Sequence, residues 1–312
     1  MMTRIAVLDD WQDQARALAD WSALQARAEV AFFRDPLGGV EEAAAQLANF
    51  DIILTMRERM AFPAALAARL PRLRMLGITG QRAAAIDVAA LQARGVTVCH
   101  TAGTPASPPP QTSLAATAEL TLGLMIAAVR RIAEGDAAIR AGRFQQDVAQ
   151  GHALAGRTLG LIGLGRIGAM MARYGHALGM EVLAWSQNLT VQRAREAGAV
   201  LVGKDELLAG ADVVSLHLVL SDRTRGILGA AELARMKPGA VLLNTSRGPL
   251  VEEAALVAAL QSGRILAGLD VFDREPLPPD HPLRRAPNCV LTPHVGYVVR
   301  EVMADFYRQS VA

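Results

Sequence analysis

The chain contains 312 residues, of which 52% are hydrophobic, so it is long enough to bury large cores in about two domains. Its 32 basic and 30 acidic residues leave a net charge of +2, which excludes the strongly basic surface typical of nucleic-acid-binding proteins. The longest apolar region, Leu114 to Val129, contains Glu119 and falls short of a bilayer span. The N-terminus shows no signal-peptide pattern, so we expect neither a nucleic-acid partner nor a membrane.

The N-terminal part of the chain alternates short apolar strands with alanine-rich helical stretches such as Glu41–Leu47 and Pro63–Leu70. The predicted strands are Ile5–Leu8, Val30–Phe33, Ile52–Leu54, Met75–Ile78 and Val96–Cys99. This series contains no glycine fingerprint, so we expect it to form the domain that does not bind a nucleotide. The proline cluster that follows, Pro105 to Pro110, is typical of a linker or loop.

A second series of strands and helices begins after the proline cluster. Its predicted strands are Thr158–Ile162, Glu181–Ala184, Val213–Leu216, Val241–Asn244 and Leu269–Val271. Alternation of this kind predicts parallel sheets with helices on both faces. The fold class is therefore α/β, with two doubly wound parallel-sheet domains.

The two cysteines, Cys99 and Cys289, lie far apart in the sequence, and both occupy apolar, strand-like contexts. We expect buried thiols and not a disulfide. Free thiols are typical of a reducing compartment, so a cytoplasmic location is the expectation.

The first strand of the second series ends in a G-x-G-x-x-G turn, Gly163 to Gly168, which runs into the helix-prone segment from Ala169 to Leu178. Gly163 allows the tight turn, Gly165 lets phosphates approach the backbone, and Gly168 lets the helix pack closely on the strand. The helix N-terminus then offers N–H groups and the positive end of its dipole to a pyrophosphate. A glycine-rich turn without a ligand is the alternative, but the strand–turn–helix context favours a dinucleotide site.

Three segments further along carry residues suited to the chemistry of a 2-oxo or 2-hydroxy acid. Arg247 follows the strand Val241–Asn244, at the edge of a parallel sheet where ligands collect. An arginine can bind a substrate carboxylate through two hydrogen bonds. His294 can transfer the hydroxyl proton, and Glu275 could fix the tautomer of that histidine. Each also has a structural interpretation, as a surface arginine, a buried histidine and a loop acid.

Taken together, these motifs resemble the D-isomer-specific 2-hydroxyacid dehydrogenase family. The resemblance covers nearly all of the chain, and its matching segments are, in order, Gly163–Gly168, Ser215–Leu218, Asn244–Gly248, Val251–Leu256, Leu269–Phe272 with Glu275-Pro276, and Thr292–Gly296. It implies a flavodoxin-like substrate domain formed by residues 1–102 and 292–312, and a Rossmann NAD(P)-binding domain formed by residues 103–291. It also implies an enzyme that transfers hydride between a nicotinamide cofactor and a small 2-oxo or 2-hydroxy acid, with D stereospecificity.

The resemblance further implies roles for individual residues. The catalytic residues would be Arg247 as the substrate clamp, His294 as the acid/base and Glu275 as the partner of the histidine. The cofactor-binding residues would be Gly163, Gly165, Arg166, Ile167, Gly168, Ser186, Leu218, Thr245, Ser246, Asp270 and Gly296, with Asp270 holding the nicotinamide carboxamide. The substrate would also contact Arg57, Gly80 and Gln81, although Arg57 could equally be a solvated charge. His217 could be either structural or catalytic, and no metal is expected. Family members are commonly dimers, and the apolar run Leu120–Val129 is the candidate interface.

The choice between NAD and NADP depends on the end of the second strand of the nucleotide-binding series. NAD-specific enzymes usually place an acid there to accept hydrogen bonds from the ribose. This chain has Ser186 at that point, which removes the repulsion against a 2′-phosphate, while Arg193 and Arg195 come later. The cofactor is therefore NAD or NADP, with a slight lean to NADP.

Several departures from the family pattern leave the substrate open. The proline-rich insertion at 104–111 lengthens the connection between the two series, the C-terminus comes early, and Tyr297 follows Gly296 where small residues are common. Two other function classes stay open: a corepressor-like protein that senses NAD(P) without turnover, and an assembly protein with a decayed site. The intact set of Arg247, Glu275 and His294 favours the enzyme.

Overall fold

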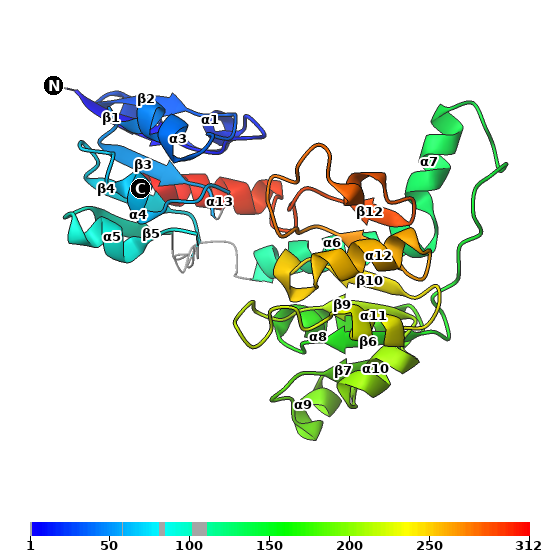
Figure 1. Ribbon diagram of the computed structural model, residues 1–312. Coiled ribbons are helices and arrows are strands. Elements are labelled where there is room, and N and C mark those ends of the chain that lie inside the picture. The colour runs from blue at the N-terminus through cyan, green and yellow to red at the C-terminus, as the bar shows by residue number, and fades with distance from the viewer. Residues whose placement is uncertain (1, 58, 81–84, 102–110) are drawn as a thin grey trace. The chain divides into compact units, whose positions relative to one another are not determined.

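The computed structural model describes residues 2–57, 59–80, 85–101 and 111–312, which form two compact units (Figure 1). Unit 1 comprises Met1–Thr112 and Val298–Ala312, and unit 2 comprises Ser113–Tyr297. The resemblance implied boundaries after residues 102 and 291, and the chain passes between the units further along, after residues 112 and 297. The second shift arises because Gly296 is bonded to Thr117 and Asp270 of unit 2.

Unit 1 is built on a parallel sheet with the strand order β2-β1-β3-β4-β5. Its strands are β1 (Thr3–Val7), β2 (Ala28–Phe32), β3 (Ile52–Thr55), β4 (Met75–Ile78) and β5 (Thr97–His100). Its helices are α1 (Ala15–Leu18), α2 (Ser22–Gln25), α3 (Val40–Leu47), α4 (Ala64–Ala67), α5 (Val88–Ala93) and α13 (Arg300–Val311). Leu47, Leu66 and Leu91 of α3, α4 and α5 are buried in one core with the strands. The C-terminal helix α13 packs on α1, and its Tyr307 hydroxyl donates to Asp10 Oδ1 at 3.2 Å.

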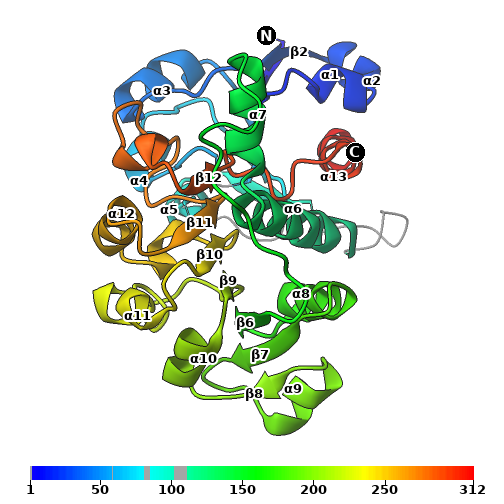
Figure 2. The same cartoon turned by 90° about the vertical axis from the view of Figure 1, so that its right-hand side faces the viewer.

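Unit 2 is built on a seven-stranded parallel sheet in the order β12-β11-β10-β9-β6-β7-β8. The strands are β6 (Thr158–Ile162), β7 (Glu181–Trp185), β8 (Val200–Leu201), β9 (Val213–Leu216), β10 (Val241–Asn244), β11 (Leu266–Leu269) and β12 (Cys289–Leu291). The helices are α6 (Gln111–Val129), α7 (Ile132–Arg140), α8 (Arg166–Ala177), α9 (Val191–Glu196), α10 (Lys204–Gly210), α11 (Ala230–Arg235) and α12 (Glu253–Gln261), with short 3-10 turns at Gly248–Leu250 and Pro282–Arg285. Helices α6, α8 and α9 cover one face, and α10, α11 and α12 cover the other (Figure 2). The predicted pair of doubly wound parallel sheets is confirmed.

Most predicted strands agree with the structure to within two residues, but one is displaced. The strand expected at Leu269–Val271 is β11, Leu266–Leu269, because Gly268 pairs with Leu243 of β10 and does not form the turn. A Cβ on Gly268 would lie 3.0 Å from the Cβ of Leu124, so the glycine lets α6 pack directly on this strand. Strand β8 was not predicted, and β12 was indicated only by the strand-like context of Cys289.

The cysteine prediction is wrong for one residue. Cys99 is exposed, because β5 is the edge strand of its sheet. Cys289 is partly buried on β12, and desolvation raises the pKa of its thiol to about 12. Both thiols are free.

Helix α6 is longer than the sequence analysis allowed. Its segment Thr112–Val129 is long and apolar enough to cross a membrane by length and composition, and 39% of that segment is buried inside the structure. The buried side chains include Leu124, Met125 and Val129, which join the core that α8 and α9 form against the sheet. The helix therefore packs on the sheet of unit 2, as the core helix of a globular unit does.

Candidate active site

The turn after β6 requires glycine at positions 163 and 168. Gly163 has a φ of 102°, and its N–H donates to the carbonyl oxygen of Trp185 at 2.8 Å. A Cβ on Gly163 would lie 2.6 Å from the carbonyl oxygen of His217, and one on Gly168 would lie 2.2 Å from that of Gly163. A Cβ on Gly165, by contrast, would meet nothing within 4 Å. The turn is thus tight where it touches protein and open at Gly165, which fits a bound pyrophosphate.

Helix α8 begins at Arg166, directly after Gly165, with Ile167 in its first turn. Within the described chain, no side chain caps this N-terminus. The first N–H groups of a helix have no partner inside the helix, and the dipole makes this end positive. The sequence-predicted cofactor residues Gly163 to Gly168 therefore form one continuous segment whose geometry suits an anion, and their contact with a cofactor stays a prediction.

Strands β9 and β10 lie beside β6 in the sheet, and the residues that follow them lie at the same carboxyl edge as the glycine turn. The Ser246 hydroxyl donates to the carbonyl oxygen of Leu218 at 3.1 Å, so these two predicted cofactor residues lie together. Thr245 is different, because its hydroxyl is buried and shares a hydrogen bond of 2.7 Å with Thr121 of α6. The side chain of Thr245 therefore anchors the end of β10 to α6.

His217 was left between a structural and a catalytic role, and its surroundings favour the structural one. Its Nε2 lies 2.9 Å from the Ser215 hydroxyl, and desolvation lowers the pKa of the imidazole to about 4. The ring is therefore neutral at neutral pH and cannot serve there as a proton donor of ordinary strength.

Arg247 follows β10 in an extended conformation and is half-buried. Its Nη1 donates to the carbonyl oxygen of Ser246 at 2.8 Å, and its own carbonyl oxygen accepts from Asn244 Nδ2 at 2.8 Å. A Cβ on the next residue, Gly248, would lie 2.1 Å from the carbonyl carbon of Phe272. Gly248 thereby brings the arginine loop against the backbone of the loop that carries Glu275.

Glu275 and His294 form a direct pair. The Glu275 Oε2 lies 2.5 Å from His294 Nδ1, while Oε1 accepts from the N–H of Phe272 at 2.9 Å. The backbone thus holds the carboxylate, and the carboxylate holds the imidazole, leaving Nε2 as the nitrogen that can exchange a proton. His294 has a φ of 54°, an uncommon conformation for a residue other than glycine, and its side chain is 26% exposed.

Asp270 holds the loop that carries His294. Its carboxylate accepts from the Thr292 hydroxyl at 2.6 Å and from the N–H groups of Val295 at 2.8 Å and Gly296 at 2.9 Å. Burial raises the pKa of Asp270, and the three hydrogen bonds and His294 oppose that rise. Asp270 is therefore a positioning residue for His294, a role that the sequence analysis did not assign to it. Its contact with the nicotinamide stays a prediction.

The predicted substrate residues of unit 1 also lie together. Arg57 follows β3 with a φ of 54°, and its N–H donates to the Thr79 hydroxyl at 2.8 Å. A Cβ on Gly80 would lie 2.7 Å from Nη1 of Arg57, so the guanidinium rests on that glycine. The N–H of Gly80 donates to the Thr101 hydroxyl at 2.7 Å and is already engaged. The predicted residue Gln81 and the proline-rich stretch 102–110 lie outside the described residues.

Comparison with known protein families matches residues 122–296 to the D-isomer specific 2-hydroxyacid dehydrogenase NAD binding domain. The match covers more than half of the chain. The chain belongs to this family. The recognition made from the sequence motifs is therefore confirmed, and the matched segment lies in unit 2.

The relatives of this chain carry several activity names. A D-3-phosphoglycerate dehydrogenase of Archaeoglobus fulgidus is 34% identical over 85% of the chain, and the chain spans about half (49%) of that relative's length. A hydroxypyruvate reductase of Blautia hydrogenotrophica is 31% identical over 96% of the chain and 91% of the relative. The crystal structure of a phosphoglycerate oxidoreductase from Vibrio cholerae O395 has a TM-score of 0.88 at 37% identity, covering 99% of this chain and 96% of that one.

Ser186 comes immediately after β7, and it lies next to the glycine turn because the N–H of Gly163 donates to the carbonyl oxygen of the preceding residue, Trp185. Arg193 lies in the following helix α9 and is exposed. Among the described residues, no group of three or more His, Cys, Asp or Glu side chains could hold a metal ion.

Sequence reasoning missed Asp9, which follows β1 in unit 1. Its side chain is buried, with 2% of the residue exposed, and its φ is 58°. Desolvation raises the pKa of Asp9 to about 6, against the opposing effects of Arg59 and Trp11. The paired acids Asp9 and Asp10 at the end of an apolar strand were the available signal.

The raised pKa of Asp9 predicts a pH-dependent cost to folding. Between about pH 4 and pH 6 the folded state binds more protons at Asp9 than the unfolded state, so the free energy of unfolding falls as pH rises. Asp9→Asn removes this ionisation and should raise the free energy of unfolding by roughly 2 kcal/mol near pH 7.5, and by much less near pH 4. Urea denaturation at the two pH values measures the difference, and an equal effect at both would contradict the prediction.

Proposed function

We propose that this protein reduces a small 2-oxo acid to the D-2-hydroxy acid with a reduced nicotinamide cofactor. The observation that carries the proposal is the Glu275–His294 pair, held by the backbone beside the Arg247 loop in the nucleotide-binding unit. When bound, the cofactor supplies the hydride. His294 Nε2 delivers the proton to the carbonyl oxygen of the substrate, and the Glu275 carboxylate stabilises the protonated imidazole and fixes its orientation. Arg247 binds the substrate carboxylate.

The experiment that tests the proposal is a substrate screen with both reduced cofactors. Glyoxylate, hydroxypyruvate, pyruvate, phenylpyruvate and 3-phosphohydroxypyruvate should each be offered with NADH and with NADPH, following absorbance at 340 nm. We expect turnover of at least one of them, with reduction favoured at acid pH and oxidation at alkaline pH. Tight cofactor binding without turnover of any substrate would point to a sensing protein instead.

The lean to NADP is supported by Ser186, which adds no negative charge at the end of β7. Ser186→Asp should raise the KM for NADPH by about tenfold or more, because a carboxylate there repels the 2′-phosphate, and it should leave the KM for NADH equal or lower. Steady-state kinetics with both cofactors measures the change. A variant that keeps the cofactor ratio of the parent would place the ribose elsewhere.

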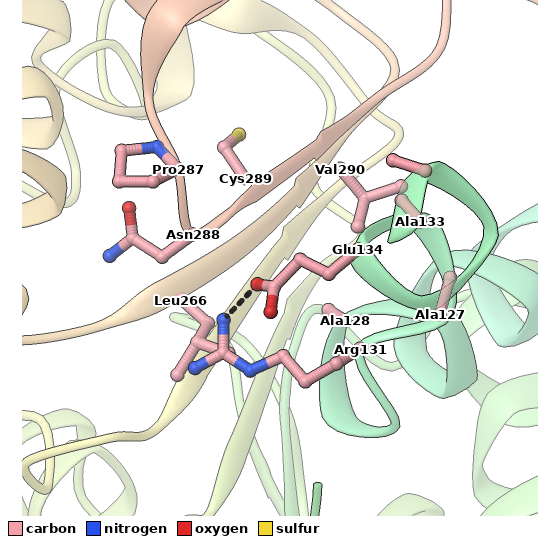
Figure 3. Close-up of a pocket in the computed structure, with 11 residues that line it drawn as sticks. Ala127, Ala128, Arg131, Ala133, Glu134, Leu266, Pro287, Asn288, Cys289 and Val290 are labelled. Atoms are coloured by element: carbon pink, nitrogen blue, oxygen red, sulfur yellow. Dashed lines mark hydrogen bonds and ion pairs between the residues drawn. The ribbon is translucent and has the colours of Figure 1, made fainter. Parts of the chain in front are cut away.

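A homodimer is the proposed assembly, and helix α7 is the surface that supports it. Ile132 and Ile139 on α7 are 52% and 56% exposed, and Phe144 in the loop beyond it is 69% exposed. A cavity of about 240 Å³ lies between α7, the end of α6 and strand β12, beside the Arg131–Glu134 ion pair (Figure 3). Helix α7 is thus loosely packed on its own unit and leaves apolar area for a second copy.

Ile139→Asp should convert the dimer to monomer, because it introduces a charge into an apolar interface. Sedimentation equilibrium measures the mass, with Val191→Asp on α9 as the matched control, since Val191 is similarly exposed (61%). A parent chain that sediments as a monomer would remove the proposal. The sequence-predicted run Leu120–Val129 supports the dimer less, because part of that run is buried in the core of unit 2.

A cytoplasmic location is also proposed, and the exposed thiol of Cys99 supports a reducing compartment.

A further inference from the structure

A cavity of about 150 Å³ lies at the amino edge of the unit 2 sheet, opposite to the edge that carries the glycine turn. Val213, Val241 and Leu266, the first residues of β9, β10 and β11, are buried and give the cavity an apolar side. A cavity of this volume can hold a molecule of about the size of benzene. It therefore has room for a small organic ligand.

Charged side chains line the rest of this cavity. They are Asp212, Arg131, His152 and Arg157. The Asp212 carboxylate is already engaged, because it accepts from the N–H of Thr158 at 2.9 Å and from Arg157 Nη1 at 3.2 Å, and Lys237 forms an ion pair with it at 3.3 Å. Burial alone would raise the pKa of Asp212, but these three contacts hold it below its usual value. The carboxylate is therefore ionised at neutral pH and compensates one of its two cationic neighbours.

Arg131 supplies the cation that is available to a ligand. It joins α6 to α7 with a φ of 55°, and its side chain is 21% exposed. Its Nη1 donates to Glu134 at 2.9 Å (Figure 3), and within the described chain Nε and Nη2 have no hydrogen-bond partner. Nε and Nη2 form one edge of the planar guanidinium, which matches the two oxygens of a carboxylate. Arg131 can thus bind a carboxylate through two parallel hydrogen bonds while it keeps its bond to Glu134.

The charge balance at the cavity favours a ligand with a single negative charge. Arg131, Arg157 and Lys237 are cationic, whereas their ion-pair partners Glu134 and Asp212 supply two negative charges. One positive charge is therefore left. A phosphate dianion would exceed this charge and would leave the apolar side of the cavity in contact with water. An uncharged molecule would leave the guanidinium edge unpaired. A carboxylate with a short apolar tail avoids both costs.

From these observations we infer that the cavity is a binding site for a small monocarboxylate with a short apolar tail. The head pairs with the open edge of Arg131, and the tail covers the apolar residues at the starts of the strands. Strands β9 and β10, of four residues each, separate this edge from the glycine turn by about 13 Å. A ligand in the cavity does not contact the turn, so the inference goes beyond the proposed reaction.

Butyrate is the probe, because it joins a carboxylate to a short alkyl chain. Titration of the parent protein, followed by saturation-transfer NMR of the butyrate methyl group, should show saturable binding. Butyramide, the uncharged analogue, should bind about tenfold more weakly, and an equal concentration of inorganic phosphate should not displace butyrate. Equal binding of butyrate and butyramide, displacement by phosphate, or the lack of saturable binding would overturn the inference. This comparison needs no variant.

Arg131→Gln removes the guanidinium edge and should weaken butyrate binding by about tenfold. Arg140→Gln is the matched control, because Arg140 lies at the other end of α7, pairs with Asp136 at 2.8 Å and is not among the residues that line the cavity. It should bind butyrate as the parent does. Unchanged binding in Arg131→Gln, or equal losses in the two variants, would remove the proposed role of Arg131 and with it the site.

Arg247→Gln separates this site from the proposed catalytic site, which should also attract a carboxylate. The variant should keep the saturable binding of butyrate. If binding were lost in Arg247→Gln and kept in Arg131→Gln, the probe would occupy the catalytic site and the inference would be wrong. Failure of the proposed function looks different, because no 2-oxo acid would then turn over with either cofactor while the butyrate titration would still give its own result.

Discussion

Replacing His294 with alanine should lower kcat for the preferred 2-oxo acid by about 10²–10⁴-fold, the usual contribution of a positioned general acid. Glu275 holds Nδ1 of the imidazole at 2.5 Å, which leaves Nε2 to deliver the proton. The alanine variant removes this proton donor. The cofactor cradle at Gly163 to Gly168 lies on other loops and does not involve His294. The dissociation constant of the reduced cofactor should therefore change little.

His281→Ala is the matched control for this variant. His281 forms a second histidine–glutamate pair in the same unit, with Nε2 at 3.0 Å from Glu253 Oε1, and its side chain is 14% exposed. It should keep kcat close to that of the parent, which separates proton transfer from the general loss of a buried pair. Stopped-flow reduction and cofactor fluorescence titration give the two quantities. An unchanged kcat in His294→Ala would remove His294 from the mechanism.

The strands and the glycine turn could be predicted from the sequence because their signals are local. A strand buried on both faces is a short apolar run, and a turn that touches backbone on two sides must be glycine at fixed spacings. In the structure, a Cβ on Gly163 would lie 2.6 Å from a backbone oxygen, and a Cβ on Gly168 would lie 2.2 Å from one. Strand β11 was displaced because Gly268 resembles a turn residue locally, and only the packing of α6 on the sheet explains it.

The details that could not be predicted depend on contacts between distant parts of the chain. Asp270 holds Thr292, Val295 and Gly296, which draws the His294 loop into unit 2 and moves the boundary beyond residue 291. The hydroxyl of Thr245 is bonded to Thr121, more than a hundred positions earlier. No local pattern in the sequence records such pairings, although the residue types at both ends are suitable for them.

The loops after β1 and β3 of unit 1 show a different limit. Asp9 follows β1 and Arg59 follows β3, and each looks like part of an ordinary charged loop in the sequence. The parallel pairing of β1 with β3 brings these two loops together, so that Arg59 reaches the carbonyl oxygen of Asp9. Residues at the ends of adjacent parallel strands should therefore be considered together when a substrate site is sought.

Removing the guanidinium of Arg247 should lower kcat/KM by about 10²–10⁴-fold, because two charge-assisted hydrogen bonds to the substrate carboxylate are lost. The side chain is half-buried, and its loop is fixed by Asn244 and by the close approach of Gly248 to Phe272. Arg247→Gln tests the loss of charge, and Arg247→Lys keeps the charge without the planar fork. The lysine variant should fall between the parent and Arg247→Gln, since an ammonium attracts the carboxylate but does not fix its orientation.

A substrate without the carboxylate separates this role from a structural one. The parent should strongly prefer the 2-oxo acid over its neutral 2-oxo amide, and Arg247→Gln should lose most of that preference while its rate with the amide changes little. Arg235→Gln is the control, because Arg235 makes a surface pair with Asp205 at 3.4 Å and an exposed hydrogen bond to the carbonyl oxygen of Ala231 at 3.3 Å, and the change should leave both rates unchanged. If Arg247→Gln instead lowered both rates equally, the arginine would support the loop between β10 and α12 and would not bind the substrate. The carboxylate would then need another cation, for which the guanidinium of Arg57 resting on Gly80 is the candidate.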